Sequence, residues 1–397
     1  MSGGPAGEQG ASIAENFSLV IGGPFHRILR RTALLGPRQT VNSVLAWLLL
    51  TWGPLFGLCL AAGTAWGNRV RIPLLYDFAT YGRFFFALPL LIASEFLIDP
   101  YLRQAILTLN FSDIIRSEEL PAYHASLQRV VQLRDSSFME LFLALLAFFP
   151  FFLLLDNHEW MYSQVSTWHG AASQGLSPAG WWFVLAASPL VRFLMLRWFW
   201  RYALWSYLLR NVSRLHLDLL ATHPDRMGGF YFLLRAQQHF GFLATALGSV
   251  VAGQLANEIV HLGRPLSEIR GPAVVFTILS VLIVLFPMAF FSLRLFQARR
   301  DGLERYNLVA RRVTTRFDVK WARGSGAPPE SMIGSQEPSS LIDYISTYDV
   351  IRSTRVIPIS KRGVIYIAAL AAAPFAFVWL VASPLDKLIA EIFRQLL

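Results

Sequence analysis

Long runs of apolar residues dominate the pattern of hydrophobic and polar positions along this 397-residue chain. A bilayer core of about 30 Å is crossed by about 20 consecutive, mainly apolar helical residues. Seven stretches meet this condition, and the clearest is the run FMELFLALLAFFPFFLLL. The predicted spans are residues 43–66, 83–98, 138–155, a helix from Trp181 past Arg201, a helix from Phe230, 273–295 and 364–382. The pattern predicts an all-α fold, a polytopic bundle of about seven transmembrane helices.

Helical periodicity continues beyond several of these spans. Apolar residues recur at helical spacing over 122–135, before the third span, and from Leu204 to Leu220, after the fourth, with no helix breaker until Pro224. The sixth span continues past Leu303 with arginines between its apolar positions. An amphipathic helix needs a partner for its apolar stripe. We therefore expect these extensions to pack together as a helical collar, a cytoplasmic helical domain beneath the membrane.

Composition divides the chain into four regions. They are a tail over 1–40, a transmembrane bundle with its extensions over 41–298, an arginine-rich helical region over 299–362, and the last span with a short amphipathic helix over 363–397. Residues 324–340 are rich in Gly, Pro, Ser and Glu, which predicts a flexible linker. A new helix is expected to begin at Ser340 and to end before Pro358.

The distribution of Lys and Arg sets the predicted orientation. The tail carries Arg27, Arg30, Arg31 and Arg38, seven cations lie between Arg299 and Lys320, and residues 157–180 contain none. Cytoplasmic flanks carry the excess of Lys and Arg in membrane proteins. These counts predict an amino terminus in the cytoplasm and a carboxy terminus on the far side of the membrane.

Overall composition excludes several classes of protein. The chain is 54% hydrophobic and 15% charged, with a mean hydropathy of +0.45. A soluble fold of this composition would have too few polar residues to cover its apolar ones. The net charge of +10 is assigned to arginines at a membrane face rather than to nucleic-acid binding. A single cysteine excludes an intrachain disulfide and a cysteine metal cluster.

No catalytic motif stands out. The sequence contains no phosphate-binding P-loop, serine elbow, zinc-protease helix or dinucleotide fingerprint. In the loop before the fourth span, Asp156, His158, Glu159 and His169 follow no known metal-ligand spacing, and neighbouring tryptophans favour an interfacial loop. The sequence thus predicts no enzyme, no cofactor and no metal site.

Polar residues inside the spans are the main candidates for function. Arg192 falls near mid-membrane, where an ionisable group is a functional hypothesis by default and a buried structural pair is the alternative. Arg197 and Arg201 are interpreted as interfacial anchors whose long side chains reach the surface. The expected polar cluster consists of Arg192, His239 and Gln238, with Glu95, Glu140 and Arg235 nearer the cytoplasm. Such a cluster either lines a path that favours anions or locks the bundle.

A conspicuous turn joins the fourth and fifth spans. It contains His223, Pro224, Asp225, Gly228 and Gly229. Proline fixes one dihedral angle, aspartate can cap the next helix, and paired glycines permit close backbone approach. His-Pro-Asp also occurs in the J domains of co-chaperones, but nothing else in this chain matches them. A structural turn is the favoured interpretation.

Two resemblances follow from these features. The turn, together with the patch at 348–352 and 356–358, resembles an uncharacterised group of bacterial multi-pass membrane proteins. This resemblance implies a location in the bacterial inner membrane, with the carboxy terminus in the periplasm, and no particular activity. The layout resembles that of insect chemoreceptor ion channels, which are tetrameric cation channels with seven spans, an inward amino terminus and a pore lined by the last helix. Here that span is rich in alanine and nearly uncharged, so a pore would have an apolar gate.

Two functions are compatible with this pattern. The leading hypothesis is an oligomeric ion channel or transporter of unknown solute, a homo-oligomer embedded in the lipid bilayer. The alternative is a scaffold or sensor that binds a cytosolic protein or anionic lipid through Arg311, Arg312 and Arg316. An enzyme acting on lipid ranks third, because no nucleophile or acid pair is evident.

Overall fold

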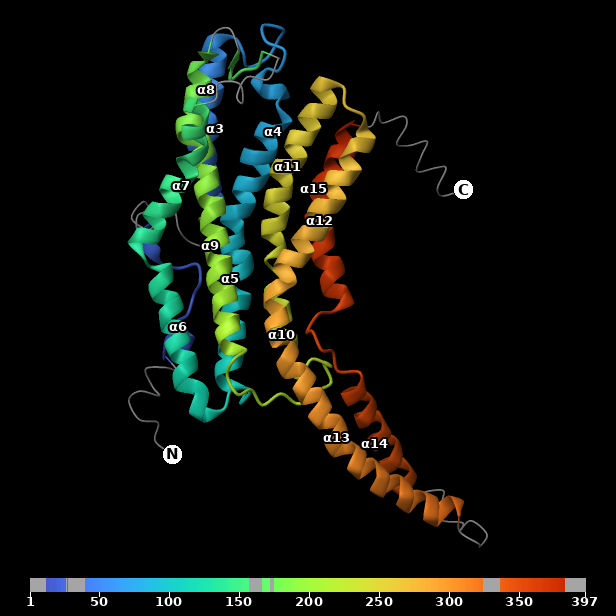
Figure 1. The fold of residues 1–397 in the computed structure, drawn as a ribbon. Helices are drawn as coiled ribbons and strands as arrows, with labels where there is room; N and C mark the ends of the chain where they lie inside the picture. Colours follow the sequence, from blue (N-terminus) through green and yellow to red (C-terminus); the bar gives the residue numbers. More distant parts are fainter. Residues whose placement is uncertain are drawn as a thin grey trace, which may run out of the picture.

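A computed structural model describes residues 12–25, 27, 40–156, 166–171, 175–323 and 336–382, and it is a bundle of long helices (Figure 1). The helices are α3 (Thr40–Ala62), α4 (Phe78–Tyr81), α5 (Leu88–Phe111), α6 (Leu120–Arg134), α7 (Ser137–Asp156), α8 (Pro178–Trp182), α9 (Ser188–Val212), α10 (Tyr231–Gln238), α11 (Gly241–Leu262), α12 (Arg270–Leu285), α13 (Ser292–Phe317), α14 (Gln336–Arg352) and α15 (Lys361–Ala382). Two short antiparallel strands, β1 (Gly170–Ala171) and β2 (Gly175–Leu176), lie in the loop before α8.

Six continuous helical stretches among the described residues are long and apolar enough to cross a membrane. They are Val41–Ala62, Phe78–Phe111, Pro178–Val212, Tyr231–Leu262, Leu266–Ala322 and Lys361–Trp379. The remaining predicted span corresponds to α7, whose apolar stretch Ser137–Phe149 is shorter. The predicted all-α, multi-pass membrane bundle is confirmed.

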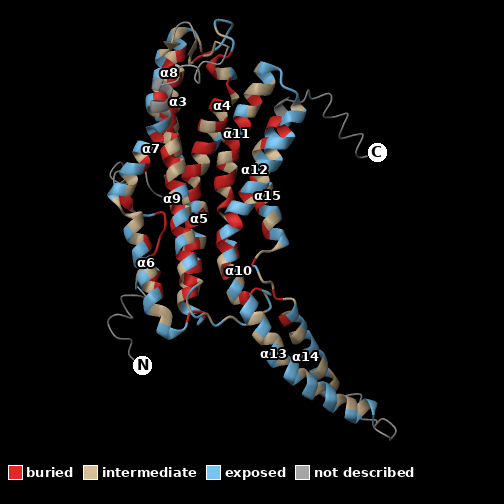
Figure 2. Ribbon diagram, in the orientation of Figure 1, coloured by how far each residue is buried: buried red, intermediate tan, exposed pale blue. Residues whose placement is uncertain are grey.

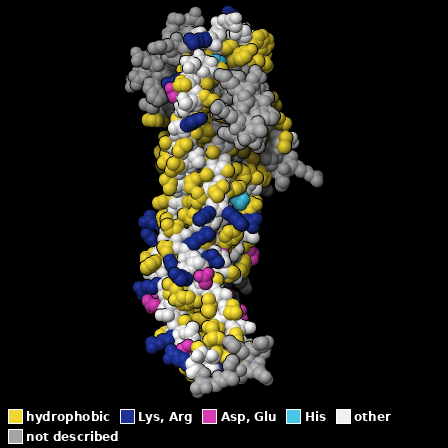
Figure 3. Space-filling view, turned by 90° about the vertical axis from the view of Figure 1, so that its right-hand side faces the viewer, with side chains coloured by type: hydrophobic (Ala, Val, Ile, Leu, Met, Phe, Trp, Pro, Cys, Tyr) yellow, Lys and Arg dark blue, Asp and Glu magenta, His cyan; other side chains and the backbone are white. Residues whose placement is uncertain are grey.

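The outer surface of the bundle is apolar. Figure 2 shows buried residues along the inside of the bundle, and exposed residues on the outward side of α12. Large apolar side chains of α12 are exposed, for example Val275 at 56% and Leu282 at 61%. Figure 3 shows a broad hydrophobic band on one face, with Lys and Arg side chains gathered below it. This arrangement fits a lipid-facing surface, because a soluble protein rarely exposes so large an apolar area.

Small residues bring α4, the following π-helix η2 (Gly82–Ala87) and α11 close together. A β-carbon at Gly253 would lie 2.7 Å from the carbonyl oxygen of Phe78, and one at Gly82 would overlap the carbonyl of Ser249. Membrane helices associate largely through such close backbone packing. A second π-helix, η5 (Phe183–Ala187), interrupts the α8–α9 span, and the Arg83 guanidinium carbon lies 5.1 Å from its Phe183 ring centroid.

Several predicted boundaries were wrong. The second span begins at Phe78 rather than at residue 83, α14 begins at Gln336 rather than at Ser340, and α9 ends at Val212 instead of continuing to Pro224. After α9 the chain leaves the helix because Leu217 forms an isolated bridge with Ile115. Most of the predicted linker, residues 324–335, lies outside the described residues. The predicted carboxy-terminal helix, residues 385–397, also lies outside them.

The extensions form two groups rather than one collar. Helix α6 packs against α9, whereas α13 and α14 pair with each other. In Figure 1 the α13–α14 pair, called here the arm, projects from one end of the bundle. We call this the arginine-rich end, and the end that carries α8 the opposite end.

Candidate functional site

A network of ion pairs is buried between α5, α7 and α9. Glu95 lies on α5, and Arg197 and Arg201 lie four residues apart on α9, so the two arginines share one helix face. Nη1 of Arg201 is 3.1 Å from Oε1 of Glu95. Nε of Arg197 is 3.4 Å from Oε1 of Glu140 on α7, and its Nη1 is 3.9 Å from Glu95. The two arginine side chains are only 4% and 7% exposed, so this is a desolvated network.

The N-terminal segment, residues 12–25, lies against this network. Two carboxylates accept from its main chain: the amide of Leu19 donates to Asp99 at 3.2 Å, and that of Phe25 to Glu140 at 2.6 Å. Four guanidinium groups donate to its carbonyl oxygens. These contacts run from Arg103 to Phe17, from Arg134 to Ser18, from Arg201 to Val20 and from Arg197 to Gly22. We call the eight side chains around the segment the charged cluster: Glu95, Asp99, Arg103, Arg134, Asp135, Glu140, Arg197 and Arg201.

The N-terminal segment fills its site closely. Phe17, Leu19 and Val20 are at most 2% exposed. The cavity that remains beside Glu95, Arg197 and Arg201 measures about 20 Å³, room for about one water molecule. The described part of the chain therefore gives no wide aqueous path through the charged cluster.

The polar cluster expected from the sequence is divided in the structure. Glu95 and Glu140 belong to the charged cluster. Arg192 lies apart, where its Nη1 is 3.4 Å from the carbonyl oxygen of Ala147 on α7. The interpretation of Arg197 and Arg201 as interfacial anchors was wrong, because both are buried in ion pairs.

Arg235 and His239 occupy a different place, between α5, α10 and α15. The His239 ring stacks on that of Tyr101 with centroids 3.5 Å apart, and the Arg235 guanidinium carbon is 5.5 Å from the same Tyr101 ring. These groups line a cavity of about 650 Å³, called here the basic pocket. Its lining residues are Phe96, Leu97, Pro100, Tyr101, Gln104, Arg235, His239, Phe242 and Tyr366.

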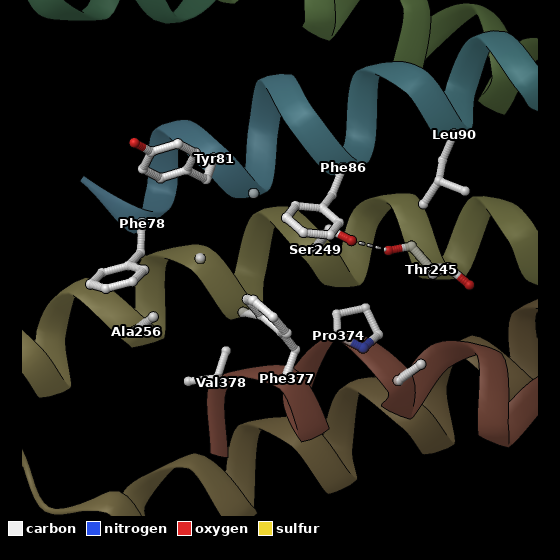
Figure 4. A pocket seen from close by; sticks show the side chains of 14 residues that line it. Phe78, Tyr81, Phe86, Leu90, Thr245, Ser249, Ala256, Pro374, Phe377 and Val378 are labelled. Atoms are coloured by element: carbon white, nitrogen blue, oxygen red, sulfur yellow. Dashed lines mark hydrogen bonds between the residues drawn. The ribbon is translucent and has the colours of Figure 1, made fainter. Parts of the chain in front are cut away.

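A second cavity, of about 230 Å³, lies between η2, α11 and α15 (Figure 4). We call it the apolar pocket. The rings of Phe86 and Phe377 stand at its mouth with centroids 5.6 Å apart, and both are about half exposed. Its walls include small residues such as Gly253 and Ala373, and its polar side chains are those of Tyr81, Thr245 and Ser249.

The two pockets lie on the same helix faces. On the second span Leu90 lines the apolar pocket and Leu97 the basic pocket, seven residues or two helical turns apart. Between them, Oγ1 of Thr245 donates to the carbonyl oxygen of Leu370 at 2.9 Å and ties α11 to α15. From Phe86 to Tyr101 the helix rises about 22 Å.

A third polar group lies at the opposite end. Asp77 accepts hydrogen bonds from Nε1 of Trp168 at 2.8 Å and from Nδ2 of Asn257 at 2.6 Å, and the His169 ring stacks on Trp168. Burial alone would raise the pKa of Asp77, but attraction to His169 and the hydrogen bonds hold it below its ordinary value. Burial lowers the pKa of His169 to about 4. The described residues contain no group of three or more potential metal ligands, and His158 and Glu159 lie outside them.

The His-Pro-Asp turn is a capped connection, as predicted. Asp225 accepts from the amides of Met227, Gly229 and Tyr231, the first residue of α10. Gly228 and Gly229 have φ of 65° and 99°, which other residues rarely adopt. The turn also meets the second patch that carries the family resemblance, because the amide of Arg355 donates to the carbonyl of Arg226 at 2.9 Å. The two patches therefore form one structural unit.

Replacing Asp225 with alanine is expected to lower the free energy of unfolding by about 2 kcal/mol. Three backbone amides lose the carboxylate that caps them, and its side chain is only 9% exposed. Thermal unfolding in detergent measures the change. Asp343→Ala on the exposed face of α14 is the matched control, and equal melting temperatures for the two variants would contradict a capping role.

The remaining predicted contact residues lie on the arm. Arg311, Arg312 and Arg316 are exposed on α13. Between the arm and the His-Pro-Asp turn is a cavity of about 990 Å³, and both arginines and aspartates line it, among them Arg294, Arg305 and Asp301. This mixed charge indicates no single class of ligand.

The geometry alone carries the functional inference, because no protein-family model, curated protein or solved structure matches this chain. The sequence candidates missed several residues of these sites, among them Asp99 of the charged cluster and two residues inside the bundle. Tyr101 organises the basic pocket, and Gln237, rather than Gln238, is the buried amide that accepts from Nε1 of Trp205 at 2.8 Å. For Tyr101 the sequence did offer a signal, because a tyrosine stands there at the end of an apolar run.

Proposed function

We propose that this membrane protein is a transporter that binds an amphiphile with an anionic headgroup, taken from the bilayer between α5, α11 and α15. The observation that carries the proposal is the position of Arg235 and His239 around Tyr101, on the same helix faces as the apolar pocket. An anionic headgroup matches the cationic side chains of the basic pocket, and a hydrocarbon tail matches the apolar side chains of the apolar pocket.

The basic pocket suits an anion. Its lining contains an arginine, a histidine and two tyrosines but no carboxylate, and no described carboxylate pairs with Arg235. An arginine binds phosphate or carboxylate oxygens through paired hydrogen bonds, which gives geometric specificity. An anionic headgroup supplies the negatively charged partner that Arg235 does not have among the described residues.

The apolar pocket suits a hydrocarbon tail. Two exposed phenylalanine rings in contact with each other form part of its rim on the outer surface of the bundle, so a tail enters sideways from the bilayer beside them. Small side chains along α11 and α15 leave the space that the tail occupies. This route needs no aqueous pore, and it places transport outside the charged cluster, where the arginines are already paired.

Binding of phosphatidylglycerol is expected to be at least tenfold weaker in Arg235→Gln and in Ala373→Phe than in the native chain. The first substitution removes the headgroup partner, and the second fills the apolar pocket. Native mass spectrometry of protein in nanodiscs containing phosphatidylglycerol or phosphatidylcholine gives the relative affinities. Arg235→Gln is expected to remove the preference for the anionic lipid, whereas Ala373→Phe weakens both lipids.

Matched controls lie on the same helix as the pocket wall. Arg362→Gln and Ala376→Phe change exposed positions of α15 outside both pockets, and they are expected to bind like the native chain. Transfer of a fluorescent phosphatidylglycerol across liposomes then tests transport itself. Equal retention of both lipids by the native chain, or unchanged selectivity in Arg235→Gln, would rule out the proposed headgroup site.

A further inference from the structure

The charged cluster holds the main chain of the N-terminal segment at several points. The apolar side chains of the segment pack into the core, and the Phe25 ring centroid lies 4.7 Å from the guanidinium carbon of Arg197. Six contacts reach backbone amides or carbonyls between Phe17 and Phe25. The Oγ of Ser18, which donates to Asp99 at 2.8 Å, is the one side chain of residues 17–25 that makes a described hydrogen bond to the cluster. In peptide recognition, main-chain hydrogen bonds supply affinity and pockets for side chains supply specificity.

The charges of the cluster are balanced without the N-terminal segment. Arg201 pairs with Glu95 at 3.1 Å and Arg197 with Glu140 at 3.4 Å. The outer pairs are Arg134 with Asp135 at 2.8 Å and Arg103 with Asp99 at 3.8 Å. An unpaired buried charge is the costly outcome when a polar contact is lost. Departure of the segment leaves every one of these arginines with a carboxylate partner.

Two glycines fix how the N-terminal segment fits. Gly22 and Gly23 have φ of 149° and 85°, and Pro24 follows them. A β-carbon at Gly22 would overlap the guanidinium of Arg134, and one at Gly23 would lie 2.6 Å from Oε1 of Glu140. A ligand for this site therefore needs two adjacent residues without β-carbons at the positions of Gly22 and Gly23, and free amides at the positions of Leu19 and Phe25.

We propose that the charged cluster is a binding site for a polypeptide segment, and that residues 17–25 are its displaceable resident. The segment is then an intramolecular plug at the end of the bundle predicted to face the cytoplasm. A competing segment with the same backbone requirement takes its place. This site is separate from the two lipid pockets, so the proposal stands or falls independently of them.

A truncated protein lacking residues 1–27 is expected to bind a fluorescein-labelled peptide of residues 12–27 added in solution. N-methylation of Leu19 in the peptide removes the amide that donates to Asp99, and it should weaken binding at least tenfold. N-methylation of Ile13, whose amide makes no described contact with the cluster, is the control and should leave affinity unchanged. Fluorescence anisotropy in detergent measures both. Absence of binding by a folded truncated protein, or equal affinity of the two methylated peptides, would overturn the proposal.

A second measurement uses the full-length chain, so that it does not depend on folding of the truncated protein. The one cysteine, Cys59, is replaced by alanine, and Ser18→Cys then reports exposure of the segment to a soluble maleimide. A tethered segment competes at an effective concentration on the order of mM, so unlabelled peptide is added at several mM. The peptide should raise the labelling rate of Ser18→Cys several-fold and leave that of Ala105→Cys, buried on α5, unchanged. If the peptide does not change the labelling rate of Ser18→Cys, the segment is not displaceable and the proposal is wrong.

Discussion

Replacing Arg201 with methionine is expected to lower the free energy of unfolding by about 3–5 kcal/mol. Glu95 loses its 3.1 Å partner and keeps Arg197 at 3.9 Å, while the carbonyl of Val20 loses its donor. The Arg201 side chain is 4% exposed, so water does not replace these contacts. Thermal or denaturant unfolding in detergent micelles measures the loss. Arg210→Met, an exposed position on the same helix, is the matched control.

A double replacement separates the ion pair from a general packing defect. Glu95→Leu combined with Arg201→Met removes both charges, so no buried carboxylate is left without its partner. The double variant is expected to be more stable than Arg201→Met alone, because leaving one charge unpaired costs more than removing the pair. If Arg201 were an interfacial anchor, Arg201→Met would behave like Arg210→Met, with an effect of about 0–1 kcal/mol.

The membrane-spanning helices could be predicted from the sequence because lipid imposes a local requirement. A run of about 20 apolar residues is visible without knowledge of its neighbours. The cap formed by Asp225 could also be predicted from the sequence, since it depends on residues within six positions of each other. Both features are properties of a short stretch of chain.

The charged cluster could not be predicted in the same way, because its contacts join α5, α7, α9 and the N-terminal segment. Contact between Glu95 and Arg201 spans 106 positions in the sequence. A partial signal existed: Glu95 and Asp99 are four residues apart, as are Arg197 and Arg201, so each pair occupies one helix face. Which faces meet depends on helix packing, and no hydropathy pattern marks the N-terminal segment at all.

Two other wrong predictions, the buried glutamine of α10 and the end of α9, depend on detail that hydrophobic periodicity does not give. Gln237 is buried while its neighbour Gln238 is not, because successive residues of an α-helix are rotated by about 100°. The leucines after Val212 continue a helical spacing, yet they belong to a loop that pairs with Ile115. Periodicity gives the spacing of apolar residues but not where a helix ends against its neighbours.

Replacing His169 with glutamine is expected to flatten the dependence of stability on pH between about 6.5 and 4. Burial lowers the pKa of His169 to about 4 in the folded chain, against about 6.5 when unfolded. Within this window the unfolded chain binds a proton that the folded chain does not. Acidification therefore removes stability from the native protein, by about 3 kcal/mol over the whole window.

The pH window distinguishes His169 from its neighbour Asp77. The pKa of Asp77 is lowered in the folded chain, so its contribution is complete above about pH 4 and is lost only as pH falls further. Melting temperatures in detergent from pH 7 to pH 4 give the slope for each variant. His261→Gln, at the same end of the bundle and bonded to the carbonyl of Tyr76, is the matched comparison variant. A slope for His169→Gln equal to that of the native chain would mean that the pKa of this imidazole is the same in the folded and the unfolded chain, and that the contact with Trp168 does not exclude water.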